Sequence, residues 1–104
     1  GLADVPGVIL PPSALEESVW HQFIIRVKNR DDVQVRLKAE GIPTMIHYPI
    51  PPHLSEAYAD MKFKRGDFPV AEEMADTFLS LPIGPHMPED DVHTVIRAVK
   101  KVLA

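Results

Sequence analysis

The 104-residue sequence predicts an α/β (α+β) two-layer sandwich, in which a small sheet carries helices on one face. Two observations lead to this fold class. Apolar runs typical of strands alternate with segments of helical apolar spacing, in the order strand, helix, strand, helix, strand, helix. The length also suits one domain with one modest core, because a chain of this size buries roughly 65% of its unfolded surface.

The composition fits a globular protein and argues against several classes of partner. Hydrophobic residues make up 45% of the chain and charged residues 25%, which argues against disorder. A net charge of −4 with scattered Lys and Arg makes nucleic acid an unexpected partner. The absence of cysteine excludes disulfides and thiolate chemistry and fits a cytoplasmic location. No apolar run reaches the roughly 20 residues that span a bilayer and no signal pattern occurs, so we expect no membrane partner.

The first segments of the chain predict a lead-in followed by a strand. Residues 1–17 contain three prolines and no sustained periodicity, and we interpret them as an extended linker cut from something longer. The domain itself is expected to span residues 18–104, beginning with a strand over residues 18–27. That strand carries large apolar groups on both faces, so it should be covered on both. The cover is provided either by helices of this domain or by a part of the protein beyond these residues.

A helix is predicted next. Asn29 is a possible N-cap, acidic residues 31–32 suit the first turn, and Val33 and Leu37 lie one helical turn apart. Gly41 can adopt the left-handed conformation of a C-terminal cap. The local order is therefore strand, helix, strand.

The stretch that follows Gly41 carries most of the chemical information. Residues 42–46 form an apolar run with the length of a short buried strand. His47 and Tyr48 should end this strand, because three of the next four residues are prolines, which donate no backbone hydrogen bond. An imidazole and a phenol held there can each donate and accept hydrogen bonds near neutral pH, as a substrate contact would. The alternative is a buried His and Tyr bonded to the domain's own backbone.

The second half of the chain predicts two helices separated by a strand. A turn or two of helix over residues 54–59 and a polar loop over residues 62–67 precede a helix that starts at residues 68–69. A strand over residues 78–82 and a last helix over residues 89–103 follow. The expected buried stripe of the first helix consists of Ala71, Met74, Ala75 and Phe78, and that of the last helix of Val92, Val95, Ile96, Val99, Val102 and Leu103.

The other polar and aromatic residues favour structural roles. The five histidines show no pair at helical i, i+4 spacing, so we expect no metal site. Glu72 is expected to be solvated or to interact with a helix N-terminus, and Arg26 to be an exposed strand residue. Trp20 and Phe23 are expected in the core. Since there is no glycine-rich nucleotide loop, Ser-His-Asp arrangement or paired-carboxylate motif, spacing alone names no reaction.

Several motifs in one order resemble the C-terminal portion of the DegT/DnrJ/EryC1/StrS sugar aminotransferases. The resemblance runs from about residue 19 to residue 103, and the IHYPIPPH wording is most similar to members that aminate the 3-keto carbon of a dTDP-linked 6-deoxyhexose. The segments that carry it are residues 19–23 (VWHQF), 30–31 (RD), 41–44 (GIPT), 46–53 (IHYPIPPH), 57–58 (AY), 68–72 (FPVAE) and 79–83 (LSLPI).

The resemblance implies a pyridoxal-phosphate enzyme of fold type I that works as a homodimer. This chain would be its small C-terminal domain, with a mostly antiparallel sheet, while the Schiff-base lysine and most cofactor ligands belong to a large domain absent here. No catalytic, cofactor-binding or metal-binding residue is therefore expected in this chain. The resemblance assigns substrate binding to His47 and Tyr48, which would lie near the sugar nucleotide, and more weakly to His53.

The implied reaction is ping-pong transamination in deoxyaminosugar biosynthesis, for example that of lipopolysaccharide O-antigen. Glutamate is the expected amino donor, a keto-sugar nucleotide is the acceptor, and the chain alone should be inactive. Two alternatives stay open: a pyridoxal-phosphate sugar 3-dehydratase of the same superfamily, and a free-standing sugar-nucleotide binding module. If a missing domain covers one sheet face, the chain should also expose an apolar patch and self-associate.

Overall fold

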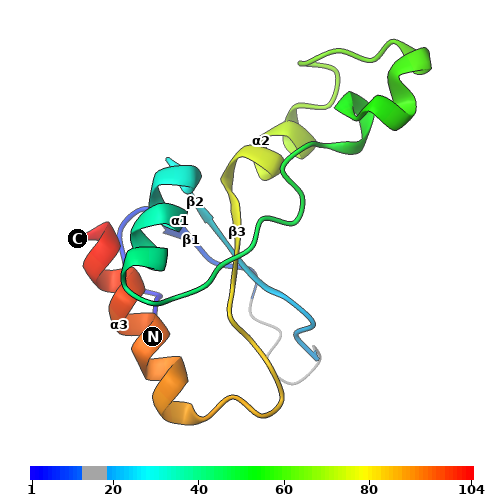
Figure 1. The fold of residues 1–104 in the computed structure, drawn as a ribbon. Helices are drawn as coiled ribbons and strands as arrows, with labels where there is room; N and C mark the ends of the chain where they lie inside the picture. Colours follow the sequence, from blue (N-terminus) through cyan, green and yellow to red (C-terminus); the bar gives the residue numbers. More distant parts are fainter. Residues whose placement is uncertain (13–18) are drawn as a thin grey trace.

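The computed structural model describes residues 1–12 and 19–104 and confirms the predicted fold class. Within these residues a three-stranded antiparallel sheet in the order β1-β2-β3 is combined with helices (Figure 1). In chain order the elements are β1 (Val8–Ile9), β2 (Phe23–Val27), α1 (Arg30–Ala39), the 3₁₀ turns η1 (Pro52–Leu54) and η2 (Glu56–Met61), α2 (Pro69–Thr77), β3 (Phe78–Leu81) and α3 (Glu89–Leu103).

The register of β2 and β3 sorts their side chains onto two faces. Ile25 pairs with Leu79, and both side chains are fully buried in the core. The next pair along the ladder, Ile24 with Ser80, must point to the opposite face, because side chains alternate along a strand. The serine therefore lies in an apolar strand with its hydroxyl directed away from the core.

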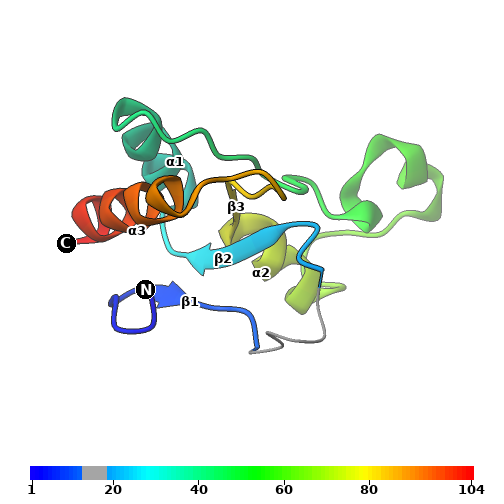
Figure 2. The same cartoon turned by 90° about the horizontal axis from the view of Figure 1, so that it is seen from below.

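Helices α1 and α3 pack together and cover the core face of the sheet (Figure 2), while α2 contacts β2 and leads directly into β3. The stripe of α3 is as predicted at its centre and C-terminal end, where Val95, Val99 and Val102 are buried. Val33 and Leu37 of α1 are also buried, as expected. The largest fully buried side chains are Ile25, Leu37, Leu79, Val27 and Val99.

The N-terminal segment differs from the expected linker. Leu2 is 7% exposed and belongs to the core, and Val8 pairs with Val27 at the edge of β2. Residues 1–12 therefore pack on the domain. The short strand β1 gives the open edge of β2 a backbone hydrogen-bonding partner. The remainder of the predicted lead-in, residues 13–17, lies outside the described residues, as does Ser18 of the predicted first strand. That strand is also shorter than expected, because β2 begins only at Phe23.

The predicted strand over residues 42–46 is wrong except for one backbone pair. Met45 exchanges two hydrogen bonds with Ser80, with N···O distances of 3.1 and 2.8 Å, and forms an isolated bridge at the outer edge of β3. The next residue on the same edge, two positions earlier, is Pro43, which has no N–H to donate. Ile42 is buried as predicted, whereas the Met45 side chain is 62% exposed.

The ends of α1 are built differently from each other. Gly41 adopts the expected left-handed backbone, with φ 81°. Asn29 occupies the N-cap position, but it is itself left-handed and its side chain makes no capping hydrogen bond. The predicted cap is thus wrong in its chemistry, although the helix begins where expected.

Residues 50–68, which we call the arm, project away from the sheet and its helices (Figure 1). The expected turn or two of helix over residues 54–59 is present as the two 3₁₀ turns η1 and η2. The arm gives the molecule extents of 48 × 31 × 22 Å and a radius of gyration of 15.3 Å, against about 13 Å for a globular domain of this length. In the described part of the chain, no helix combines the length and apolar character needed to cross a membrane.

Candidate functional site

A pocket of about 430 Å³ lies beside β3 and brings together residues that are distant in sequence. The bridge between Met45 and Ser80 holds residues 43–47 against the strand, and the segment before β2 contributes a further wall. We call this cavity the β3 pocket. Its polar lining consists of His21, Gln22, Thr44, His47 and Ser80.

His47 is the predicted site residue that lines the β3 pocket. Its ring is half-buried, and Nδ1 lies 2.8 Å from the hydroxyl oxygen of Ser80. Either group can donate in this hydrogen bond, depending on the imidazole tautomer. Within the described residues nothing bonds to Nε2, so this nitrogen is available to a ligand.

Tyr48 lies next to His47 on the surface rather than in the pocket. Its side chain is 73% exposed, and its ring meets the His47 ring edge-on with 5.6 Å between the centroids. The two predicted residues are therefore side by side, as expected. The alternative, a buried His and Tyr bonded to the domain's own backbone, would require both rings to be enclosed by this domain. His47 is only half-buried and Tyr48 is exposed, so neither ring is enclosed.

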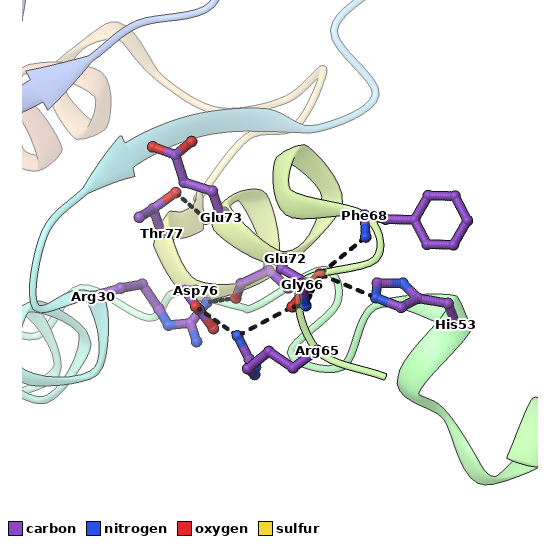
Figure 3. A network of polar contacts seen from close by, with 10 residues as sticks. Arg30, His53, Arg65, Gly66, Phe68, Glu72, Glu73, Asp76 and Thr77 are labelled. Carbon is purple, nitrogen blue, oxygen red and sulfur yellow. Dashed lines mark hydrogen bonds and ion pairs between the residues drawn. The ribbon is translucent and has the colours of Figure 1, made fainter. Parts of the chain in front are cut away.

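His53 is placed in the arm, where its side chain is only 7% exposed (Figure 3). Nε2 lies 3.3 Å from Oε2 of Glu72. The rings of Phe63 and Phe68 pack edge-on against the imidazole, with 6.4 and 4.8 Å between the ring centroids. The imidazole is thus held inside the arm and does not lie in the β3 pocket with His47. Because aromatic rings and a carboxylate enclose it, His53 cannot contact a ligand unless the arm moves.

Glu72 is buried, at 4% exposure, so the first of its two expected roles, a solvated acid, is wrong (Figure 3). The second is found, because Glu72 binds the backbone at the N-terminus of α2, whose N-cap residue is Phe68. Its carboxylate accepts hydrogen bonds from the N–H of Gly66 at 2.8 and 2.9 Å and of Phe68 at 3.2 Å. Arg65 adds an ion pair at 3.7 Å. Burial alone would raise the pKa of Glu72, but the hydrogen bonds from Gly66 and Phe68 and the neighbouring His53 outweigh it and lower the pKa below its ordinary value.

The remaining candidates have structural contacts. Arg26 is 29% exposed and pairs with Glu73 at 2.9 Å, so it joins β2 to α2 instead of projecting freely from the strand. Trp20 is half-buried and packs against Phe23, with 5.3 Å between the ring centroids. Phe23 packs against the core as predicted.

Sequence reasoning missed four of the five polar residues of the β3 pocket. Ser80 carried a signal, because a serine between two core leucines of a strand must face the other side of the sheet. His21, Gln22 and Thr44 carried none, since their meeting depends on how the segment before β2 lies against residues 43–47. The hydroxyl oxygen of Thr44 is buried without a hydrogen-bond partner among the described residues, as is Nε of Arg26.

The described residues do not form a pyridoxal-phosphate site. No lysine lines the β3 pocket, and all six lysines of the chain are exposed. Lys100 and Lys101 pair with Asp4 at 3.4 Å and Glu40 at 2.8 Å. A Schiff base with this cofactor requires a lysine close to the reacting group. Such a lysine would have to come from outside these residues.

Comparison with known proteins assigns the chain to a family. The model of the DegT/DnrJ/EryC1/StrS aminotransferase family matches residues 1–100. The chain belongs to this family. The sequence-based resemblance is thereby confirmed, and the match includes the N-terminal residues that we had interpreted as a linker.

Two relatives illustrate which members are similar to this chain. The erythromycin biosynthesis sensory transduction protein EryC1 of Saccharopolyspora erythraea is 49% identical over 95% of this chain and 27% of its own length. The dTDP-3-amino-3,4,6-trideoxy-alpha-D-glucose transaminase of Streptomyces venezuelae is 46% identical over 97% of this chain and 27% of its own length. The chain thus spans about a quarter of the length of these family members.

Solved structures of the family share this fold. The crystal structure of S. venezuelae DesV, described as a complex with a ketimine intermediate, has a TM-score of 0.90 at 46% identity and covers 96% of this chain and 27% of that one. The pyridoxal-phosphate form of the putative sugar aminotransferase Spr1654 from Streptococcus pneumoniae has a TM-score of 0.78 at 26% identity, covering 92% and 26%. The solved structures similar to this chain therefore include the pyridoxal-phosphate form of a putative sugar aminotransferase.

Proposed function

We propose that this chain is the small C-terminal domain of a nucleotide-sugar aminotransferase. The intact protein would transfer an amino group from glutamate to a keto-sugar nucleotide such as a dTDP-3-keto-6-deoxyhexose, as a homodimer in the cytoplasm. The observation that carries the proposal is the 46% identity over 97% of this chain to a transaminase named for a dTDP-3-amino sugar. The similar backbone of DesV, with a TM-score of 0.90 to this chain, supports it.

In this proposal the chain contributes substrate positioning. His47 and Tyr48 lie at the surface, where a sugar nucleotide could reach both rings. Their hydrogen bonds would orient the keto sugar, and a fixed orientation lowers the barrier of a reaction between two bound groups. His53 is assigned to holding the arm, because Glu72 and two phenylalanine rings enclose it.

A chimera tests the proposal. This chain replaces the matching segment of the S. venezuelae transaminase, and amination of a dTDP-3-keto sugar is measured with glutamate as donor. We expect an active chimera that is saturated by the sugar nucleotide. A folded chimera that accepts glutamate but never aminates the sugar would contradict the proposal.

The 104-residue chain alone provides the second test. Mixed with pyridoxal phosphate, it should develop no specific cofactor absorbance, because no lysine lines its pocket. A stoichiometric adduct at one lysine, trapped with borohydride, would contradict the division of labour proposed here.

The alternative of a sugar-nucleotide binding module rests on the β3 pocket, which is formed by this chain's own residues. Binding of a dTDP-sugar by the chain alone, measured by calorimetry, would favour that module. The sugar 3-dehydratase alternative differs at the Schiff-base position, which lies outside these residues, and amination by the chimera does not separate the two. Sequencing the parent gene around that position does.

A further inference from the structure

We propose that Ser80 is a positioning residue for the substrate site. Its hydroxyl holds the ring of His47 through Nδ1 and leaves Nε2 to bind a hydroxyl group of the ligand in the β3 pocket. This inference rests on the proposed function, because the ligand is taken to be the sugar part of a nucleotide sugar.

The first argument is the placement of the Ser80 side chain. Ser80 is 6% exposed and lies on β3 between two core leucines, in a position where an alanine or valine would satisfy the sheet equally well. A buried hydroxyl requires a hydrogen-bond partner. Within the described residues that partner is Nδ1 of His47, at 2.8 Å.

The second argument is the chemistry of the imidazole. If Ser80 donates to Nδ1, then Nε2 carries the proton and donates; if Nδ1 donates to Ser80, then Nε2 accepts. A sugar hydroxyl can both donate and accept, so it matches either tautomer. Holding the ring in one orientation thus preserves a contact that a freely rotating imidazole would lose.

The third argument is what shares the pocket with His47. His21 and Gln22 line the β3 pocket from the segment before β2, and both can bond to hydroxyl groups. Thr44 also lines the pocket, but its hydroxyl oxygen is buried and not exposed to the cavity. Besides His47, the pocket therefore offers two side chains that can bond to the hydroxyl groups of a sugar.

The test measures the imidazole directly. The ¹⁵N shifts of Nδ1 and Nε2 of His47 are recorded against pH for the wild-type chain, Ser80→Ala, Ser80→Thr and the control Ser55→Ala. Ser55 also hydrogen-bonds through its hydroxyl, to the carbonyl of Pro52 at 2.7 Å, but lies in the arm. We expect Ser80→Ala to change the tautomer ratio of His47, while Ser80→Thr and Ser55→Ala keep it. Unchanged His47 shifts in Ser80→Ala would overturn the inference.

The chimera adds a functional readout. Loss of one hydrogen bond in Ser80→Ala should lower kcat/KM for the keto sugar by about two- to tenfold. The half-reaction with glutamate should stay unchanged, whereas a general folding defect would slow both halves. If Ser80→Ala does not fold, Ser80→Cys replaces it, because a thiol is only a weak donor. A chimera with unchanged Ser80 that does not aminate the sugar would refute the proposed function, whereas the His47 shifts would separately show whether Ser80 holds the imidazole ring.

Discussion

The imidazole of His47 and the phenol of Tyr48 are neighbours in sequence but differ in their surroundings. His47 is half-buried, lines the β3 pocket and is bonded to Ser80. Tyr48 is 73% exposed, and its ring packs edge-on against the His47 ring. His47 is therefore held by a hydrogen bond within its own domain, whereas the Tyr48 side chain extends into the surroundings.

Removal of the Tyr48 hydroxyl tests its role as a substrate contact. In the chimera we expect Tyr48→Phe to raise KM for the keto-sugar nucleotide by about two- to tenfold, as expected for one lost hydrogen bond. Tyr58→Phe is the matched control, since Tyr58 is also exposed but lies on η2 in the arm. Equal kinetics of Tyr48→Phe and wild type would remove Tyr48 from the site.

At the scale of single elements, the arm depends on the ionised form of Glu72. Hydrogen bonds from Gly66 and Phe68 lower its pKa against the opposing effect of burial. A lowered folded-state pKa means that the carboxylate stabilises the fold at neutral pH, and that this contribution is lost as the pH falls through the folded-state value. The arm should therefore loosen only in acid, below the ordinary glutamate pKa of about 4.3.

NMR amide shifts of Gly66 and Phe68 follow this transition. In the wild-type chain both shifts should titrate with a midpoint below about 4.3, and in Glu72→Gln the titration should be absent. Glu56→Gln is the control, because Glu56 lies exposed on η2. The interpretation fails if both amides titrate alike in Glu72→Gln and in the wild type.

Arg30 connects α1 to the end of α2. It is 7% exposed and donates from Nη1 to the carbonyl oxygens of Ala75 and Phe78, while Nε donates to Asp31 at 2.7 Å. Carbonyls at a helix C-terminus lack partners within the helix, so Arg30 supplies them. We expect Arg30→Met to lower the free energy of unfolding by about 2 kcal/mol, because hydrogen bonds of a charged donor are lost.

Urea unfolding measures this difference. Arg36→Met is the control on the same helix, since Arg36 is 49% exposed and its contact with Asp32 is a surface ion pair at 3.7 Å. Its effect should stay within about 0.5 kcal/mol. Two variants of equal stability would show that Arg30 does not hold the end of α2.

The elements that could be predicted from the sequence are those set by local pattern. The stripe of α3 and the short apolar run of β3 ended by Pro82 depend on neighbouring residues alone. The strand expected over residues 42–46 failed because one proline limited its pairing to Met45. The burial of Glu72 could not be predicted from the sequence. Its hydrogen-bond donors, the N–H groups of Gly66 and Phe68, belong to a segment whose path follows no periodic pattern.

The candidate site divides in the same way. His47 and Tyr48 could be located from the prolines that follow them, and the structure places them side by side at the surface. The β3 pocket could not, because it requires the register of Ser80 with Met45 and the approach of His21 from another segment. Contacts between distant segments are the part of a site that periodicity does not report.

At the scale of the whole molecule, a second pocket of about 310 Å³ is lined almost wholly by apolar side chains. It lies between the N-terminal segment, the end of β3 and the start of α3, and its wall includes Val92, which is 41% exposed. Further large apolar side chains of the arm are exposed, among them Ile50 at 58% and Met61 at 55%. An apolar pocket with exposed apolar residues in its wall is typical of an interface.

The 104-residue chain should therefore bind a hydrophobic dye and self-associate at high concentration. Val92→Lys places a charge at the rim of the apolar pocket and should reduce both dye fluorescence and association. Val35→Lys is the matched control, because Val35 is a 66% exposed valine on α1 outside the lining of this pocket. Sedimentation measures association, and a strictly monomeric wild-type chain without dye binding would show that this surface is too small or too divided to act as an interface. Equal effects of the two lysine variants would instead assign the association to net charge, since each reduces the negative charge of the chain equally.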